Sequence, residues 1–465
     1  MFIPEKFKCK NGLVIGAGKS GVACANLLVR GGFKILLSDT LPLTELKKRL
    51  KKLNSKVEVE AGGHTDKFLS CDFAVKSPGV SRSNPIMLKL KKNGIPVFSE
   101  IETALAFSKT AEVLAVTGTN GKTTTTVLLG EIMKRALKAR GSKTWVCGNV
   151  GTPAALIAKK SGVGDTIVME VSSYQLEDSS CLHPLTACIL NITPDHLDHH
   201  GTLGNYIAAK ARVFRFQNKE DACVFNADDA HCRQVAARCP SRKLFFSSSR
   251  KGGLLNAWVE DGRLVFHLDG KRHVMTAPAL PGLHNLENAM CAGLMALTRG
   301  VDRADIQKTF SVFKGVEHRM EPAGKKRGIT FINDSKATNV DSTMVALRAL
   351  ETGRRNIWLI LGGLDKGNPY APLKPLIGKA VKAVLTIGAA AVKIEKELKS
   401  AAPIISAGTM AKAVAVALDR GERGDIVLFS PACASFDQFR DFEDRGRKFK
   451  SLVKNLTSRK PAINY

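Results

Sequence analysis

Short apolar runs recur along the chain, and a polar or glycine-rich segment follows almost every one of them. Runs of this kind are typical of strands buried in a parallel sheet. The strands expected from them cover residues 13–15, 34–37, 73–76, 113–116, 144–147, 166–170, 187–191, 357–361, 383–387 and 426–429. Segments with helical character lie between them and predict helices at 22–29, 100–107, 203–214, 281–297 and 410–418, and from Lys122 onward. The alternation of the two patterns predicts the α/β class.

Residues 243–277 depart from this alternation. Apolar and polar residues alternate over 264–268, and the turn signal Asp269-Gly270 follows, so this stretch predicts a small antiparallel addition. A chain of 465 residues suits two to four domains of about 100–200 residues each. We expect three domains: Rossmann-like at 1–105, P-loop ATPase-like with a parallel sheet at 106–315, and Rossmann-like at 316–465. No internal period indicates a repeat array.

The most specific motif spans residues 112–126 and reads EVLAVTGTNGKTTTT. Its apolar start predicts a strand, the segment 118–121 a glycine turn, and the following Lys-Thr pair the start of a helix. Together these form a phosphate cradle, in which Lys122 reaches the terminal phosphates and the Thr123 hydroxyl holds Mg²⁺. Val116 stands where the full P-loop pattern has its first glycine. The alternative, an ordinary tight turn, does not require this strand-and-helix context.

A second glycine motif lies near the N-terminus. Residues 16–21 read GAGKSG between a predicted strand and a predicted helix, and Asp39 ends the next strand about 20 residues on. This arrangement is the dinucleotide-binding fingerprint, and it indicates a diphosphate-linked nucleotide more strongly than NAD in particular. The segment 77–79, Ser-Pro-Gly, follows another strand, where open α/β sheets bind ligands, although a simple turn explains it equally well.

Polar residues follow three predicted strands of the central domain, which predicts a site along one edge of its sheet. Asn149 follows the first strand, Glu170 ends the second, and the segment 195–200, DHLDHH, follows the third. A carboxylate at the position of Glu170 holds Mg²⁺ beside the γ-phosphate in P-loop enzymes. The segment 195–200 is a candidate metal site without zinc-site spacing. Taken singly, His196 is more typical of a hydrogen-bonding surface histidine, and Lys210 of a helix-face lysine.

Composition narrows the class of protein. Hydrophobic residues make up 44% of the chain, yet no apolar run approaches the roughly 20 residues needed to span a bilayer. Residues 1–12 lack the apolar stretch of a signal peptide. The 11 cysteines are scattered without a C-x-x-C pair, which indicates reduced thiols and not disulfides or zinc. We therefore expect a cytoplasmic protein without membrane insertion.

The net charge of +28 raises nucleic acid as a possible partner. The basic residues are, however, spread along the whole chain, and aromatic residues make up 6% of it, so no stacking platform is evident. The densest basic runs, at 47–52 and 448–460, are typical of solvated helix faces. We expect anionic small molecules as partners and no nucleic acid.

Eight segments resemble, in order and spacing, the Mur ligases, the ATP-dependent enzymes that add amino acids in peptidoglycan synthesis. These segments are GTNGKTT (118–124), EVSSYQLE (170–177), NITPDHLDHHG (191–201), AAKARVF (208–214), LPGLHNLENA (280–289), HRME (318–321), NDSKATN (333–339) and LGGLDKG (361–367). The block SPACASFDQFRDFEDRG at 430–446 is similar to the D-glutamate-adding branch of that family. The resemblance covers essentially the whole chain. The ATP loop alone is shared with folylpolyglutamate synthase, so another Mur ligase or a folylpolyglutamate synthase-like ligase is the alternative.

The resemblance implies a reaction and its participants. ATP would phosphorylate the alanine carboxylate of UDP-N-acetylmuramoyl-L-alanine, and the amine of D-glutamate would attack the resulting acyl phosphate. It implies two Mg²⁺ ions, one held with Thr123 and Glu170, the other by His196 and by Lys210 modified to a carbamate. The N-terminal domain would bind the uridine nucleotide, the central domain ATP, and the C-terminal domain the incoming amino acid. We expect a monomer.

The resemblance also implies site residues, position by position. Catalytic roles fall on Lys122, His196 and Lys210. ATP contacts would be Gly118, Thr119, Asn120, Gly121, Lys122, Thr123, Thr124, Asn288, Arg319 and Asp334. Substrate contacts would be Gly16, Gly18, Ser20, Asp39, Ser77, Gly79 and Asn149 for the uridine nucleotide, and Thr338, Lys366, Ser435 and Phe442 for D-glutamate.

Two other classes of protein stay open from the residues alone. An NAD-dependent dehydrogenase would use GAGKSG but would leave the second phosphate loop without a role. A P-loop switch or motor would hydrolyse ATP to drive a partner, but it has no need for the block at 430–446. Release of ADP and phosphate that requires both D-glutamate and the uridine substrate would separate the three classes.

Overall fold

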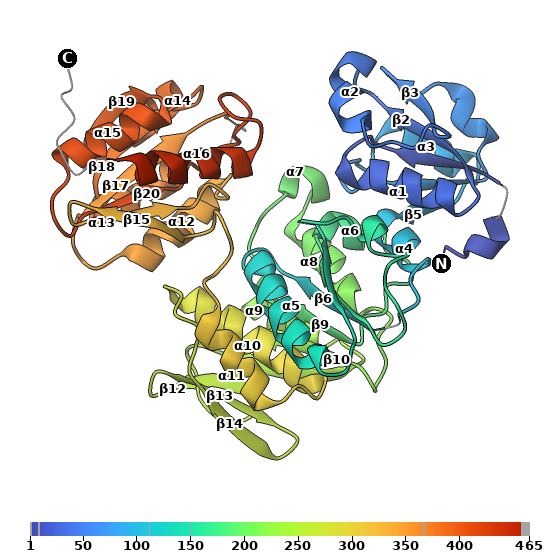
Figure 1. Ribbon diagram of the computed structural model, residues 1–465, viewed down its shortest axis with the longest axis horizontal. Helices are drawn as coiled ribbons and strands as arrows, with labels where there is room; N and C mark the ends of the chain where they lie inside the picture. The colour runs from blue at the N-terminus through green and yellow to red at the C-terminus, as the bar shows by residue number, and fades with distance from the viewer. Residues whose placement is uncertain are drawn as a thin grey trace. The chain divides into compact units, whose positions relative to one another are not determined.

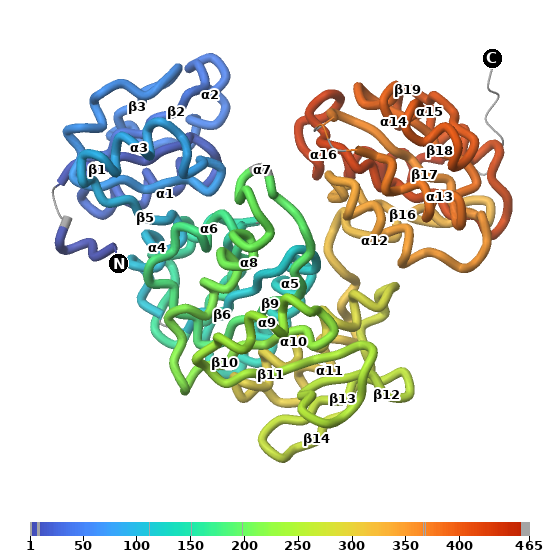
Figure 2. The backbone as a smooth tube through the Cα atoms, turned by 180° about the vertical axis from the view of Figure 1, so that it is seen from behind, coloured from blue at the N-terminus to red at the C-terminus, as the bar shows by residue number. Residues whose placement is uncertain are grey.

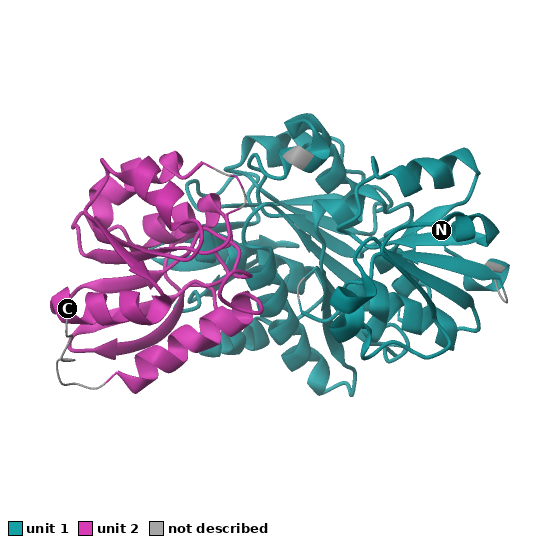
Figure 3. Cartoon of the chain, turned by 90° about the horizontal axis from the view of Figure 1, so that it is seen from above, with its two compact units in different colours: residues 1–279, 284–313 teal, residues 280–283, 314–465 magenta. Residues whose placement is uncertain are grey.

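The computed structural model describes residues 2–7, 10–110, 112–149, 151–365, 367 and 369–456. The chain forms two compact units, residues 1–279 with 284–313 and residues 280–283 with 314–465 (Figure 3). The first unit contains a five-stranded and a nine-stranded sheet, and the second contains a six-stranded sheet. The expected three-part α/β architecture is therefore confirmed. The domain limits after 105 and 315 stay a prediction, because the first two domains belong to one compact unit.

The N-terminal sheet has the strand order β3-β2-β1-β4-β5, and all its strand pairs are parallel. Its strands are β1 (Asn11–Ile15), β2 (Lys34–Asp39), β3 (Glu58–Ala61), β4 (Phe73–Lys76) and β5 (Val97–Ser99), and its helices are α1 (Lys19–Arg30), α2 (Leu43–Leu50) and α3 (Pro85–Lys92). Successive residues of β1 enter different cores: Val14 shares one with α1, and Leu13 shares the other with α3. Burial on both faces explains why these strands read as continuous apolar runs.

The central sheet has the order β14-β13-β12-β11-β10-β9-β6-β8-β7. Its strands are β6 (Glu112–Thr117), β7 (Thr144–Gly148), β8 (Thr166–Glu170), β9 (Thr186–Ile189), β10 (Ala222–Asn226), β11 (Arg242–Ser247), β12 (Ala257–Glu260), β13 (Arg263–Leu268) and β14 (Lys271–Met275). The antiparallel addition expected at 243–277 is confirmed for β12, β13 and β14 (Figure 2). It is wrong for β11, which pairs in parallel with both β10 and β12.

Strand β6 occupies the position where the strand order reverses. From β6 the chain continues to β7 and β8 on one side, and then to β9, β10 and β11 on the other. Figure 1 labels β6, β9 and β10 of this sheet. Open α/β sheets bind ligands outside the carboxyl ends of the strands at such a point. The helices of this domain are α4 (Glu100–Leu105), α5 (Lys122–Lys138), α6 (Ser173–Glu177), α7 (Leu197–His200), α8 (Leu203–Ala211), α9 (Ala230–Ala236), α10 (Leu283–Thr298) and α11 (Arg303–Val312).

The C-terminal sheet has the order β15-β16-β20-β17-β18-β19. Its strands are β15 (Glu321–Lys326), β16 (Ile329–Asn333), β17 (Ile357–Gly362), β18 (Val381–Ile387), β19 (Ile404–Gly408) and β20 (Ile426–Phe429), and its helices are α12 (Val340–Leu350), α13 (Lys374–Ala380), α14 (Ala391–Leu398), α15 (Met410–Arg420) and α16 (Phe442–Asn455). Helices α12, α13 and α14 contribute to the core of one face, and α15 and α16 to that of the other. The antiparallel β15–β16 hairpin was not expected, because β15 carries mostly polar and glycine residues.

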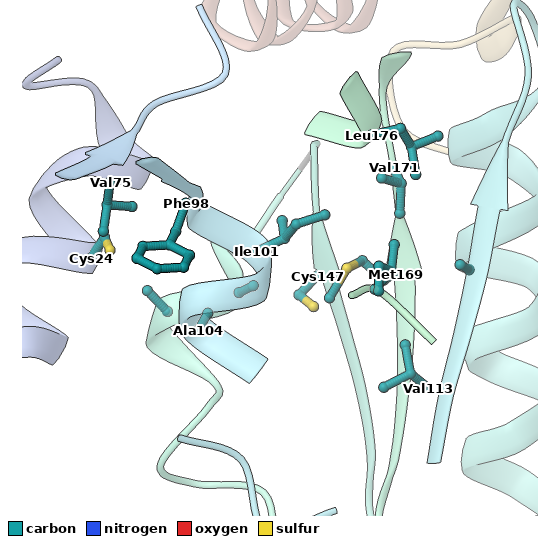
Figure 4. Packing of buried hydrophobic residues seen from close by; sticks show 14 of the residues in the cluster. Cys24, Val75, Phe98, Ile101, Ala104, Val113, Cys147, Met169, Val171 and Leu176 are labelled. Atoms are coloured by element: carbon teal, nitrogen blue, oxygen red, sulfur yellow. The ribbon is translucent and has the colours of Figure 1, made fainter. Parts of the chain in front are cut away.

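Helix α4 connects the first two domains through their shared core. Figure 4 shows Phe98, Ile101 and Ala104 between residues of the N-terminal sheet region, such as Val75, and residues of the central sheet, such as Met169. All of these side chains are at least nine-tenths buried. Among the described residues, no helix combines the length and the apolar character required to cross a bilayer.

Glu100, the first residue of α4, carries a carboxyl group into this core. Its Oε1 has no hydrogen-bond partner among the residues that the structure describes, and burial raises the pKa of the carboxyl group from 4.5 to about 7. Because the folded state binds this proton more tightly than the unfolded chain, the free energy of unfolding falls as the pH rises from about 4.5 to 7.

The variant Glu100→Gln should therefore gain stability at high pH. We expect its free energy of unfolding at pH 8 to exceed that of the wild type by up to about 3 kcal/mol, with the gain largely gone at pH 4.5. Urea denaturation at both pH values measures this difference, and Glu45→Gln on the exposed surface of α2 is the control. Equal stability changes at the two pH values would contradict the assignment.

Candidate active site

The glycine turn at 118–121 joins β6 to α5 at the switch point of the central sheet. Gly121 precedes α5 with φ +83°, and a Cβ atom there would lie 2.3 Å from Asn288 Oδ1. Gly118 has φ +154°, and a Cβ atom there would lie 2.9 Å from the Leu190 Cβ. Both positions therefore require glycine. Since α5 starts directly after the turn, the backbone N–H groups of its first turn and the positive end of its dipole lie there, as anion binding requires.

Two side chains hold the turn in place. Asn191 Oδ1 accepts the Asn120 N–H at 2.8 Å, and Asn191 Nδ2 donates to the Asn120 carbonyl at 3.2 Å. The Thr119 hydroxyl lies 3.1 Å from the Tyr206 hydroxyl and accepts the Thr193 N–H at 3.1 Å. Sequence reasoning did not assign Asn191 a role, and its only signal was its place at the end of an apolar run.

The two predicted catalytic lysines converge on one carbonyl oxygen. Lys122 Nζ donates to the Gly118 carbonyl at 2.9 Å and to the Thr119 carbonyl at 2.7 Å. Lys210 Nζ donates to the same Gly118 carbonyl at 2.8 Å and lies 4.4 Å from the centroid of the Tyr206 ring. Lys210 is 1% exposed. Its burial, and then the charge of Lys122, lower its pKa well below the usual value.

Asn288 of α10, a predicted ATP contact, lies beside the turn. The Thr125 hydroxyl donates to Asn288 Oδ1 at 3.2 Å, and Asn288 Nδ2 donates to Asn285 Oδ1 at 3.3 Å. These contacts tie the first turn of α5 to the start of α10. Thr124, another predicted contact, is buried in the same turn of α5.

Glu170 and Thr123 have the chemistry of a Mg²⁺ site. Glu170 ends β8 and lies in parallel register with Val116 of β6, one residue from the end of that strand. Its side chain is buried, and Asn149 Nδ2 donates to its Oε1 at 3.0 Å. Thr123 is buried in the first turn of α5. Carboxylate and hydroxyl oxygens are the ligands that Mg²⁺ prefers, so these residues fit the ion.

His196 precedes α7 with φ +53°. Its ring lies edge-on to Tyr174 at a centroid distance of 5.0 Å and edge-on to Tyr206 at 6.4 Å. Lys210 contacts the same Tyr206 ring, so the side chains of His196 and Lys210 share Tyr206 as a neighbour. The structure thus places both predicted ligands of the second ion in one cluster.

A second cluster contains two histidines close to His196 in the sequence. Its members, Glu177, His199 and His200, were not predicted as a group from the sequence. His199 Nε2 lies 2.8 Å from Glu177 Oε2, and His200 Nε2 lies 3.0 Å from the Ser173 hydroxyl. The ligand atoms of Glu177, His199 and His200 all lie within 4.8 Å of one another. The sequence marked 195–200 as a candidate metal site, but Glu177 comes from α6 and its contact with α7 required the fold.

The N-terminal fingerprint lines a cavity of about 520 Å³. All seven residues predicted to contact the uridine nucleotide line it: Gly16, Gly18, Ser20, Asp39, Ser77, Gly79 and Asn149. Lys19, Arg49 and His64 add basic or titratable groups that sequence reasoning did not single out, and Gln175 joins the wall from α6. A cavity with cationic side chains and a glycine loop suits a diphosphate.

Asp39 has a structural task in this cavity. Its Oδ2 accepts the Ala17 N–H at 2.6 Å, and its Oδ1 accepts the Leu41 N–H at 2.9 Å. Gly21 packs so closely on the loop that a Cβ atom there would lie 1.9 Å from the Gly16 carbonyl oxygen. The carboxylate of Asp39 therefore holds the glycine loop in position, with each oxygen already bonded to the backbone.

Arg319 and Asp334, predicted to contact ATP, both belong to the second compact unit. Asp334 is buried, and it accepts hydrogen bonds from the Ser430 hydroxyl at 2.8 Å and from the Met320 N–H at 3.2 Å. Burial raises the pKa of Asp334 to about 6, although the charge of Arg319 opposes this rise. The two residues therefore interact within their own unit.

Three of the four residues predicted for D-glutamate lie on segments that one buried arginine ties together. Arg445 donates to the carbonyls of Ser335 and Ala434 at 2.7 and 3.1 Å, which fixes the segments that carry Thr338 and Ser435. The Ser335 hydroxyl donates to the carbonyl of Phe442 at 2.8 Å. Lys366, the fourth predicted residue, lies outside the described residues. Sequence reasoning did not single out Arg445.

Three family descriptions match the chain. Residues 10–99 match the Mur ligase MurD-like N-terminal domain, residues 116–296 the Mur ligase middle domain, and residues 318–433 the Mur ligase glutamate ligase domain. Each match corresponds to one of the three sheets.

Full-length relatives carry a consistent name. The chain is 48% identical to UDP-N-acetylmuramoylalanine–D-glutamate ligase of Elusimicrobium minutum, over 98% of this chain and 100% of that protein. It is 43% identical to the enzyme of the same name from Koribacter versatilis, over 96% and 98%.

Solved structures share the fold at low identity. The UDP-N-acetylmuramate-alanine ligase MurC of Thermotoga maritima is 21% identical with a TM-score of 0.61, over 96% of this chain and 99% of that one. MurF ligase of Thermotoga maritima, in complex with ADP, is 18% identical with a TM-score of 0.55, over 98% of both chains.

Proposed function

The chain belongs to the Mur ligase family, and on that premise we propose that it joins D-glutamate to UDP-N-acetylmuramoyl-L-alanine with conversion of ATP to ADP and phosphate. One observation carries this proposal: a single chain holds two separate glycine loops of the kind that binds nucleotides, each at the carboxyl ends of parallel strands. The two loops suit two phosphorylated substrates, and the third domain matches the glutamate ligase domain.

The chemistry explains why two nucleotides are needed. A carboxylate is a poor electrophile, and an amine attacks it only after one oxygen becomes a good leaving group. Transfer of the γ-phosphoryl group to the alanine carboxylate achieves this, and attack by the D-glutamate amine then expels phosphate from a tetrahedral intermediate. Phosphoryl transfer depends on positioning and on neutralisation of charge, which is what the residues around the turn supply.

The side chains at the turn have distinct tasks in this scheme. The N–H groups of α5 bind the phosphates, and the Lys122 ammonium leaves its own loop carbonyls to contact the γ-phosphate. Thr123, Glu170, His196 and a carbamate formed on Lys210 would hold Mg²⁺ ions, which neutralise phosphate charge when bound. Asn288 is proposed as a further ATP contact in the first unit, and Arg319 and Asp334 as ATP contacts in the second.

The N-terminal cavity binds the uridine diphosphate in this proposal, and not NAD. In the dinucleotide fingerprint an acidic residue at the end of the second strand accepts the ribose hydroxyl. Both oxygens of Asp39 accept backbone N–H groups, so its carboxylate has a role in holding the loop that does not require NAD. The dehydrogenase alternative also leaves the phosphate turn at 118–121 without a task.

Turnover assays test the function directly. We expect release of ADP and phosphate that requires both D-glutamate and UDP-N-acetylmuramoyl-L-alanine, and no reduction of NAD with any combination of these substrates. Preference for L-lysine or diaminopimelate over D-glutamate would assign another Mur ligase activity, and preference for a folate would assign the folylpolyglutamate synthase-like one. ATP hydrolysis without either acceptor would favour a switch or motor.

The D-glutamate pocket is proposed at Thr338, Lys366, Ser435 and Phe442. A substrate with two carboxylates requires a cation and several donors, and Lys366 with the Ser435 hydroxyl supplies these. The variants Lys366→Ala and Ser435→Ala should raise the KM for D-glutamate at least about tenfold while the KM for ATP stays within about twofold, since each removes a charge-assisted bond. Steady-state kinetics measures both constants.

Matched controls come from the same domain. Ser406→Ala and Lys399→Ala remove the same groups from exposed positions on β19 and just after α14, and they should leave both constants unchanged. If both pocket variants kept the wild-type KM for D-glutamate, Lys366 and Ser435 would not belong to the D-glutamate pocket.

A further inference from the structure

The loop that follows β4 is closed by a buried lysine. Lys76, the last residue of β4, is 2% exposed, and its Nζ donates to the Val80 carbonyl at 2.6 Å. The loop of residues 77–80 lies between these two groups and lines the N-terminal cavity. Ser77 also bonds to the glycine loop, through its N–H to the Ile15 carbonyl at 3.0 Å and its hydroxyl to the Gly16 carbonyl at 3.1 Å.

The same lysine reaches the central domain. Lys76 Nζ lies 2.5 Å from Asp178 Oδ2, and Asp178 is the C-cap residue that directly follows α6. Arg82, on the other side of the loop, contacts the second oxygen of Asp178 with its Nε at 2.8 Å and also donates to the Glu177 carbonyl. One carboxylate of the central domain therefore binds cations from both ends of the cavity loop.

Helix α6 connects the Asp178 carboxylate to the N-terminal cavity and to α7. Its Gln175 lines the same cavity as residues 77–80. Its Glu177 binds His199 of α7 at 2.8 Å, three residues after His196. A contiguous path of contacts thus runs from the cavity loop through Asp178 and α6 to the segment 195–200.

We propose that Lys76 and Asp178 form a positioning pair that sets the cavity loop against α6, so that a uridine substrate in the cavity presents its carboxylate to the phosphate turn. This inference rests on the proposed function. A buried ion pair contributes little net stability compared with a well-packed apolar pair, because its desolvation offsets the attraction. Its geometry, however, is specific, since a single register of the two domains satisfies both charges.

Variants that remove both charges separate positioning from stability. Lys76→Met leaves Asp178 buried without the ammonium and with the exposed Arg82 as an ion-pair partner, and we expect a lower Tm and an impaired enzyme. The double variant Lys76→Met/Asp178→Leu should recover most of the Tm. It should still show a KM for the uridine substrate raised at least tenfold and a lowered kcat, with the KM for ATP within twofold of the wild type.

The control is Lys67→Met, which removes an exposed ion pair with Glu58 in the same domain and should change none of these constants. A folded double variant with wild-type KM and kcat would overturn the inference, as would a KM for ATP that rises in parallel with that for the uridine substrate. Should the double variant fail to fold, Asp178→Asn tests the positioning role instead, through the KM for the uridine substrate and kcat. Inactivity of the wild type with these substrates would instead overturn the proposed function.

Discussion

Lys122→Ala will lower kcat by at least about a thousandfold while the Tm stays within a few degrees of the wild type. In the described structure the Lys122 ammonium bonds to two carbonyls of its own turn. Its loss removes positive charge that would follow the γ-phosphate as negative charge develops in the transition state. Single-turnover measurement of ADP formation separates this effect from slow product release.

The helix itself offers a matched control for this experiment. Lys138→Ala removes a lysine from the exposed C-terminal end of α5 and should leave the rate unchanged. Near-wild-type turnover in a folded Lys122→Ala variant would show that the turn at 118–121 is not the phosphate site.

The phosphate turn was predictable because its signals are local. Strand, glycine turn and helix start follow one another within residues 112–126, and the structure has each of them in that order. The residue that fixes the turn, Asn191, was not predictable, because its bonds to Asn120 depend on the pairing of β9 with β6. Periodicity reports which face of an element is buried, but it does not report which strand becomes its neighbour.

The same limit applies to the N-terminal cavity. The glycines and the 77–79 loop were predictable from their place after strands, and they do line one cavity. Lys76 reads as the polar end of an apolar run, and Asp178 as a turn residue in a separate domain. Their ion pair joins residues that are 102 positions apart in sequence, and such a contact follows from domain packing, which the local pattern does not contain.

Lys210 shows what a resemblance adds to residue patterns. On pattern alone it is a lysine on a helix, and such residues are usually exposed. The structure instead places it at 1% exposure, bonded to the Gly118 carbonyl and close to a second ammonium. A buried lysine that shares one carbonyl with Lys122 is poorly stabilised as a cation, and its pKa falls accordingly.

This environment favours a reaction with CO₂. In the proposed reaction the neutral amine of Lys210 would attack the carbon of CO₂, forming a nitrogen–carbon bond and releasing one proton, so that a carboxylate would end the side chain. The negative group would relieve the repulsion from Lys122, and its oxygens are ligands for a hard cation beside His196. An unmodified ammonium at this position would instead oppose the binding of Mg²⁺.

The variant Lys210→Ala should therefore lose at least about a hundredfold in kcat and keep its affinity for ATP. Acetate should restore part of the rate by placing a carboxylate in the vacated space, whereas Lys219→Ala, an exposed lysine beyond the same helix, should need no rescue. Activity is not the only readout: ¹³C-labelled bicarbonate should give a carbamate signal by NMR in the wild type that Lys210→Ala lacks. Full activity of Lys210→Ala, or an identical carbon spectrum in both proteins, would contradict the carbamate, because each result would leave the buried amine without the chemistry assigned to it.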